Sequence, residues 1–212
     1  MGIIQTINVY THVIAGGLLL VLGLIPILSE KGGNWHRRAG RIYLKLFIIV
    51  LVTALIGVAF FRSPPALMAV TFSAAYNFIS GVRALKIKEQ GPQLLDNMMS
   101  AFAIAVGSLM LIGMSENSTA SWSPIMGYSV IGMTAAIALY DISRNFWVAT
   151  WTHKAWPIDH GLKIVGSYFA AASAASGNLL RDFQPWSEIL PSIIGSVLSL
   201  VLVYFYLRRP AR

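Results

Sequence analysis

Four histidines are the residues in this sequence best suited to chemistry near neutral pH, because an unperturbed imidazole exchanges its proton at about pH 6.5. They are His12, His36, His153 and His160. The sequence contains no cysteine, so a bound metal ion or haem would need histidine, methionine or carboxylate ligands. The histidines therefore indicate a site for a metal ion, a haem or a transferred proton.

Three of these histidines and one aspartate fall in segments that we expect at the same face of a membrane. They are His36, His153, His160 and Asp141. Imidazole and carboxylate groups suit zinc and other first-row metals, so we predict a metal site made of these four residues, with Asp159 as the alternative carboxylate. Their spacing matches none of the tight histidine motifs of known metal sites, and the ion is therefore not specified beyond zinc as one candidate.

A basic cluster follows the first apolar run, where residues 34–45 read NWHRRAGRIYLK. We interpret it first as an anchor that attracts acidic lipid headgroups, at about 1 kcal/mol for each cation. The alternative is anion binding, in which charge-assisted contacts hold the propionates of a haem or the phosphate of a substrate. The cations concerned are Arg37, Arg38, Arg41 and Lys45.

Asp141 and Arg144 stand three residues apart in the segment LYDISRNFW. On a helix this spacing places two side chains next to each other. We favour a salt bridge with the arginine extending to the lipid headgroups. The alternative is that Asp141 accepts a hydrogen bond from a histidine and fixes its tautomer.

The elements that carry these residues are predicted to be membrane-spanning helices. The 212 residues are 56% hydrophobic and only 11% charged, whereas soluble domains have about 25% charged residues. Apolar runs of about 20 residues, the length that crosses a bilayer, recur along the chain. We predict one all-α domain over residues 1–212, a bundle of seven transmembrane helices at residues 5–28, 40–61, 65–85, 98–115, 123–146, 157–180 and 188–207.

The distribution of basic residues predicts the orientation of this bundle. Of the 16 lysines and arginines, 14 fall in alternate connections and the C-terminal tail, and only Arg62 and Arg181 fall on the opposite side. Cytoplasmic loops are enriched in lysine and arginine, so we place the N-terminus outside and the C-terminus in the cytoplasm.

Polar residues inside the apolar runs should face protein rather than lipid. This applies to Tyr76, Asn77 and Ser80 in the third run. In the sixth run, small residues at spacings of three and four should let a neighbouring helix approach closely; they are Gly166, Ala170, Ser173 and Gly177.

Two blocks of the sequence resemble a known family. His12 followed by Gly16 and Gly17, and then the pattern K-G-G-x-x-H-R-x-x-G-R-x-Y at residues 31–43, are similar to bacterial predicted membrane proteins of domain-of-unknown-function family 2306. A later histidine followed by G-S-Y and an alanine-rich run also looks like that family. The resemblance implies a multi-span protein of the bacterial cytoplasmic (inner) membrane, with His12, His36 and His160 as its principal residues.

Four functions remain open from the sequence. The first is a redox or cofactor role, in which haem or a metal is bound by His12, His36 and His160 with Arg37 and Arg41 as anion-binding groups. The others are a zinc-dependent membrane hydrolase, a small-solute or proton transporter, and a non-catalytic subunit that packs against other membrane subunits. The net charge of +8 is explained by the membrane, and we expect no nucleic acid partner.

Overall fold

The computed structural model describes residues 2–61, 65–116 and 124–208, and this part of the chain is helical with no strand. Seven helices of 20 residues or more account for most of it: α1 (Ile3–Leu28), α2 (Asn34–Phe60), α3 (Pro65–Lys86), α4 (Leu94–Glu116), α5 (Pro124–Ser143), α7 (Trp156–Leu179) and α8 (Trp186–Leu207). The short elements are η1 (Arg144–Phe146), α6 (Val148–Thr150), η2 (Trp151–Ala155) and η3 (Arg181–Phe183).

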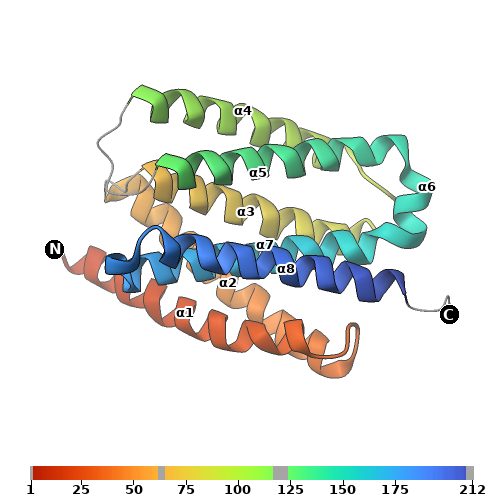
Figure 1. Ribbon diagram of the computed structural model, residues 1–212, viewed down its shortest axis with the longest axis horizontal. Coiled ribbons are helices and arrows are strands. Elements are labelled where there is room, and N and C mark those ends of the chain that lie inside the picture. Colours follow the sequence, from red (N-terminus) through yellow and green to blue (C-terminus); the bar gives the residue numbers. More distant parts are fainter. Residues whose placement is uncertain (1, 62–64, 117–123, 209–212) are drawn as a thin grey trace.

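Consecutive long helices run in opposite directions along the bundle, so the two chain ends lie at opposite ends of the molecule (Figure 1). We call the end that contains the start of α1 the N-terminal end. The other end contains the starts of α2, α4 and α7 and the last turn of α8, and we call it the basic end. Residues far apart in the sequence can therefore meet at either end.

Four of the helices are long and apolar enough to cross a membrane, judged by length and composition within the described residues: α1, α2, α4 and α8. Their apolar side chains point mostly outward. In the most apolar window of α8 only 6% of the residues are buried, which suits a surface in contact with lipid rather than water.

The predicted runs coincide with the seven long helices to within a few residues, with one clear difference. Helix α2 begins at Asn34, six residues before the predicted start at 40, so the basic cluster belongs to the helix itself. Its cations follow helical spacing and are all exposed. Charged residues lowered the hydropathy there without interrupting the helix, because arginine and lysine are good helix formers.

The centre of the bundle is a cluster of buried apolar side chains from α1, α2, α3 and α7. Phe47 and Phe78 stack with ring centroids 4.4 Å apart. The Tyr43 hydroxyl lies 3.0 Å from Ser167 Oγ and joins α2 to α7. A Cβ atom added at Gly23 would lie 2.9 Å from the Tyr168 ring, so glycine is needed for α1 to pack this closely.

The expectation that polar residues of the third run face protein is confirmed, because Tyr76, Asn77 and Ser80 are all buried. Of the small residues of the sixth run, Ser173 and Gly177 allow the close approach of a neighbouring helix that we expected. A Cβ atom added at Gly177 would lie 2.7 Å from Glu188 Cγ, and Ser173 Oγ lies 3.0 Å from Ser192 Oγ on α8.

Candidate functional site

Two groups of polar residues stand out, a buried one at the basic end of the bundle and a partly buried one toward the N-terminal end. The first is the charge cluster, which we define as Asp141, Arg144, Asp159 and Lys163. Their side chains are between 1% and 4% exposed. Two carboxylates and two cations at such burial must pair with each other, because an unpaired charge in an apolar interior is strongly disfavoured.

The pairing within the charge cluster is complete. Arg144 contacts Asp159 at 2.9 Å and Asp141 at 3.2 Å. Lys163 contacts Asp159 at 2.7 Å and also forms an ion pair with Asp141. Each carboxylate thus has both cations as partners, and the formal charges sum to zero.

Neutral donors complete the coordination of the two carboxylates. The Tyr76 hydroxyl donates to Asp141 over 2.8 Å, and Ser80 Oγ donates to the same oxygen over 2.6 Å. Trp151 Nε1 donates to Asp159 over 2.9 Å. The cluster therefore joins α3, α5 and α7 through side chains rather than through backbone contacts.

The turn between α5 and α7 brings the two aspartates together. The chain leaves α5 through the 3₁₀ turn η1, passes α6, and enters α7 through the π-helical turn η2, which contains the fully buried Trp151. Pro157 lies in the first turn of α7, where a missing N–H costs nothing. This reversal places Asp159 beside Arg144, fifteen residues earlier.

A second ion pair lies next to the cluster. Arg83 of α3 and Asp96 of α4 form a two-point contact, with Arg83 Nη2 3.0 Å from Asp96 Oδ2. Ser100 Oγ donates to the Asp96 carbonyl and lies 2.9 Å from the Tyr76 hydroxyl. Polar contacts therefore continue from α4 through Tyr76 to the charge cluster.

The sequence interpretation was right about one contact in this region and incomplete about the rest. The Asp141–Arg144 ion pair is confirmed. The arginine does not extend to the headgroups, because it is 1% exposed and bonded to Asp159 as well. Lys163, one of the 14 basic residues counted on the cytoplasmic side, is buried. The signal for the Lys163–Asp159 ion pair was available in the sequence, because residues four apart on one helix lie next to each other.

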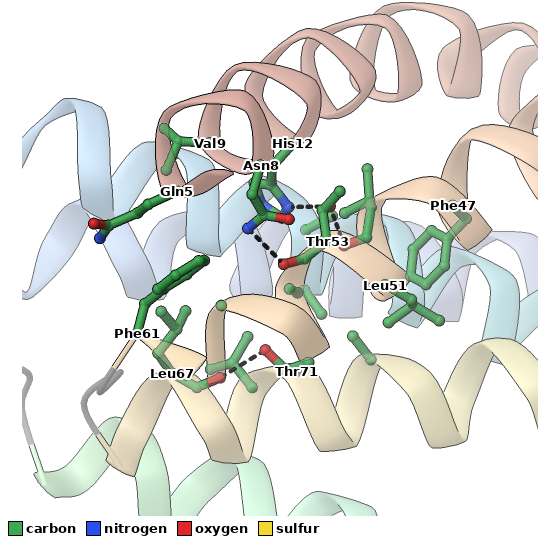
Figure 2. Close-up of a pocket in the computed structure, with 17 residues that line it drawn as sticks. Gln5, Asn8, Val9, His12, Phe47, Leu51, Thr53, Phe61, Leu67 and Thr71 are labelled. Carbon is green, nitrogen blue, oxygen red and sulfur yellow. Dashed lines mark hydrogen bonds between the residues drawn. The ribbon is translucent and has the colours of Figure 1, made fainter. Parts of the chain in front are cut away.

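The second group lies in the N-terminal half of α1 and borders a cavity. His12 Nδ1 is 2.9 Å from Thr53 Oγ1, and Asn8 Nδ2 donates to the Thr53 carbonyl over 3.1 Å. Figure 2 shows both side chains reaching from α1 toward Thr53 on α2. The Thr53 hydroxyl already donates to backbone carbonyls of its own helix, so Nδ1 of His12 is the donor. The neutral ring then keeps a lone pair at Nε2.

The cavity beside these residues has a volume of about 330 Å³ and lies between α1, α2, α3 and α7. Its wall is mostly apolar, with Phe47, Val70 and Ala170 among the lining residues. Gln5, Asn8 and His12 add polar groups on one side, and Figure 2 shows Phe61 and Leu67 on the other. The cavity exists because α1 packs mainly on α2, and α3 mainly on α7, with fewer contacts between the two pairs.

The residues predicted to bind a metal do not form such a group. Within the described parts of the chain, no three histidines, aspartates or glutamates are arranged to hold a metal ion. Asp141 is bonded to Lys163 and Arg144 instead, and His153 is exposed in η2. The spacing revealed only the contact with Arg144, because the other partners of Asp141 come from α3 and α7.

The remaining predicted residues divide between the two ends. His36 Nδ1 lies 3.0 Å from the Pro26 carbonyl, and His160 Nδ1 lies 2.9 Å from the Gly81 carbonyl, both at the basic end. His12 lies in the other half of the bundle and cannot share a ligand with them. Arg37 and Arg41 are exposed on α2, as an anchor for acidic headgroups would require.

Comparisons with protein families, curated proteins and solved structures give no match to this chain. The resemblance to domain-of-unknown-function family 2306 therefore stays a prediction.

Proposed function

We propose that this chain is a seven-span protein of the bacterial cytoplasmic membrane that binds a small amphiphilic molecule in the cavity beside His12. The observation that carries the proposal is a cavity of about 330 Å³ with a mostly apolar wall and a few polar groups. Ligand sites in proteins have volumes upward of about 300 Å³ and this same division between apolar wall and sparse polar groups.

Membrane insertion is supported by the outward-facing apolar side chains and by the four helices that meet the length and composition of a span. Helices α3, α5 and α7 are of similar length and pack among the others. Helices α5 and α7 carry charged residues of the charge cluster, and α3 carries its partners Tyr76 and Ser80, which lowers the hydropathy of these helices. An orientation with the basic end in the cytoplasm is supported by the sequence, in which 14 of the 16 basic residues fall in segments predicted on that side.

Cysteine labelling tests the orientation without background, because the chain has no cysteine. We expect a membrane-impermeant maleimide to label Arg181→Cys in intact cells, because this exposed residue lies at the N-terminal end. The matched position Glu89, exposed at the basic end, should be labelled as Glu89→Cys only after the cells are permeabilised. The reverse pattern would overturn the orientation, and labelling of both in intact cells would exclude the three spans proposed between them, because both positions would then lie on the same side.

The chemistry of the lining selects the class of ligand. Neutral His12 presents a hydrogen-bond acceptor at Nε2, while the side-chain amides of Gln5 and Asn8 bring both donors and acceptors. A ligand with a hydroxyl head and an apolar body would satisfy the imidazole and bury its body against Val50, Leu51 and Ala74. An alkanol is the simplest such molecule.

Photolabelling with an octanol that carries a diazirine tests this binding. In membranes that contain the protein, we expect label on peptides of α1, α2 and α3 that line the cavity. Unlabelled octanol should compete better than octane, because only the alcohol can donate to the imidazole. His12→Leu should abolish the difference between the two competitors.

A matched pair of phenylalanine variants separates the cavity from the lipid-facing surface. Ala54→Phe places a ring in the cavity, whereas Leu55→Phe enlarges a neighbouring side chain that is exposed. We expect Ala54→Phe to remove the label and Leu55→Phe to keep it. Equal labelling of both variants, or label spread evenly over outward-facing helices, would overturn the proposed function.

A further inference from the structure

Glu188 is a buried acidic residue in the first turn of α8, at the N-terminal end of the bundle. It is 1% exposed, although Trp186 and Leu190 on either side of it are exposed. Its side chain lies against α7, where a Cβ atom added at Gly177 would lie 2.7 Å from Glu188 Cγ and 3.2 Å from Oε1. The absence of a side chain at position 177 therefore makes the space that the carboxyl group occupies.

The carboxyl group of Glu188 lacks the partners that a buried acid normally has. Among the residues that the structure describes, Oε1 has no hydrogen-bond partner, and no ion pair includes Glu188. Neighbouring polar side chains bond elsewhere: Gln184 Nε2 donates to the Gly177 carbonyl over 3.0 Å, and Ser176 Oγ donates to backbone carbonyls that include that of Ser187. The carboxyl group is thus buried without an assigned counter-ion or donor.

The place of Glu188 at the start of a helix does not explain its burial. A glutamate three residues after the N-cap commonly bonds back to the N–H of the cap residue. The cap residue of α8 is Pro185, which has no N–H. Glu188 therefore cannot form the usual capping pair.

The charged and titratable groups on the packed elements are exposed, bond elsewhere or lie far from Glu188. Helix α8 packs mainly against α7 and η3. On η3, Arg181 and Asp182 are exposed, and on α7 the Tyr168 hydroxyl donates to a backbone carbonyl of α1. The others lie toward the basic end, about 20 Å or more along their helices: Asp159, His160 and Lys163 on α7, and Tyr204 and Tyr206 on α8.

These surroundings favour a proton as the partner of the carboxylate. An ionised carboxylate buried without a counter-ion is strongly disfavoured, and such a group becomes neutral instead. A metal cation such as Ca²⁺ takes about six to eight oxygen ligands. At the start of α8 only Ser187 Oγ is a second buried side-chain oxygen without a partner among the described residues. A single proton needs no such shell.

We propose that Glu188 is a proton-binding site at the N-terminal end of the bundle. Its carboxylic acid keeps the proton while α8 is packed on Gly177, and it exchanges the proton with water on that side of the membrane. Release of the proton would leave a buried negative charge, so it requires the start of α8 to separate from α7. The proposal does not depend on the ligand proposed for the cavity beside His12.

Infrared spectroscopy tests the proton site directly, because a protonated carboxyl group absorbs apart from carboxylates and from backbone amides. In liposomes at neutral pH, we expect the unsubstituted protein to show an acid band that shifts in ²H₂O and is lost in Glu188→Gln. Asp182→Asn, which changes an exposed acid at the same end, should keep the band. The glutamine variant keeps a neutral side chain of the same shape, so its fold should persist.

Three results would overturn the proton site. They are the absence of an acid band from the unsubstituted protein, a band that remains in Glu188→Gln, and a band that does not shift in ²H₂O. A carboxylate band that is lost in Glu188→Gln and moves when Na⁺ is added would show that the carboxylate binds a metal cation instead of a proton.

A pair of alanine variants on α7 tests the link between the proton and helix packing. Gly177→Ala adds a methyl group that collides with Glu188 Cγ, so it should displace the carboxyl group toward water and weaken the acid band. Gly161→Ala is the matched control, because its added Cβ meets no heavy atom within 4 Å, and it should keep the band. A band of full strength in Gly177→Ala would overturn this link.

Discussion

At the basic end, Asp141 and Asp159 meet Arg144 and Lys163 in a cluster with every charge paired. At the N-terminal end, His12 and Asn8 meet one residue, Thr53, and border a cavity of about 330 Å³. Both groups are polar side chains between helices. The second group borders this cavity, and His12 keeps a nitrogen lone pair for which no donor is found among the described residues.

The difference teaches which of the two regions is suited to a ligand. A buried cluster of opposite charges with all partners present holds helices in one arrangement, and its removal costs more than its formation contributes. A histidine with one bonded nitrogen beside an apolar cavity keeps a free acceptor for another molecule. We therefore expect changes at the basic end to affect the fold and changes at the N-terminal end to affect binding.

The largest effect is expected from Asp159→Ala. The substitution removes the shared partner of Arg144, Lys163 and Trp151 and leaves a buried positive charge short of a partner. The free energy of unfolding should fall by about 3–5 kcal/mol, measured by denaturant unfolding in detergent micelles. The control is Asp182→Ala, an exposed aspartate in η3, which should leave stability unchanged. Equal stability of the two variants would mean that the cluster does not hold the fold.

The close packing of α3 on α7 predicts the next effect. A Cβ atom added at Gly81 would lie 3.0 Å from Lys163 Cβ and 3.1 Å from Ile164 Cδ1. Gly81→Leu should therefore lower the free energy of unfolding by about 1–3 kcal/mol through overpacking. Gly132→Leu is the matched control, because no heavy atom lies within 4 Å of its added Cβ. The same unfolding measurement compares them.

Two alanine-to-phenylalanine variants compare an open space with a filled one. Ala54 lines the cavity, whereas Ala138 is fully buried among Tyr76, Ala103 and their neighbours. We expect Ala138→Phe to cost about 1–3 kcal/mol by overpacking and Ala54→Phe to cost less than about 1 kcal/mol. A cost as large at Ala54, measured by thermal unfolding, would show that the cavity cannot accept a group of ring size.

The smallest effect is expected at the polar side of the cavity. Asn8→Ala removes one partly buried hydrogen bond to the Thr53 carbonyl, which is worth about 1 kcal/mol. The exposed Asn178 donates to a carbonyl of its own helix, and Asn178→Ala should change stability by no more than about 0.5 kcal/mol. If Asn8→Ala lowered the free energy of unfolding by several kcal/mol, the polar group at the N-terminal end would also hold the fold, and the contrast with the charge cluster would be wrong.

Much of the helical framework was predictable from the sequence, and little of the site was. Hydropathy located the helices, and three-residue spacing correctly paired Asp141 with Arg144. The same pattern could not show that Lys163 turns inward to Asp141, twenty-two residues away along the chain. It also could not show that His36 and His160 bond through Nδ1 to backbone carbonyls of α1 and α3.

The sequence by itself determined where the helices lie, that they expose apolar surface, and that the basic residues gather at one end. These properties depend on composition and on the 3.6-residue period, which are local. The tertiary structure decided that Tyr76 meets Asp141, sixty-five residues apart, that the imidazoles separate into two regions, and that a cavity remains beside one of them. Such contacts depend on how each helix is rotated and shifted against its neighbours, and that is set by the packing of all the side chains together.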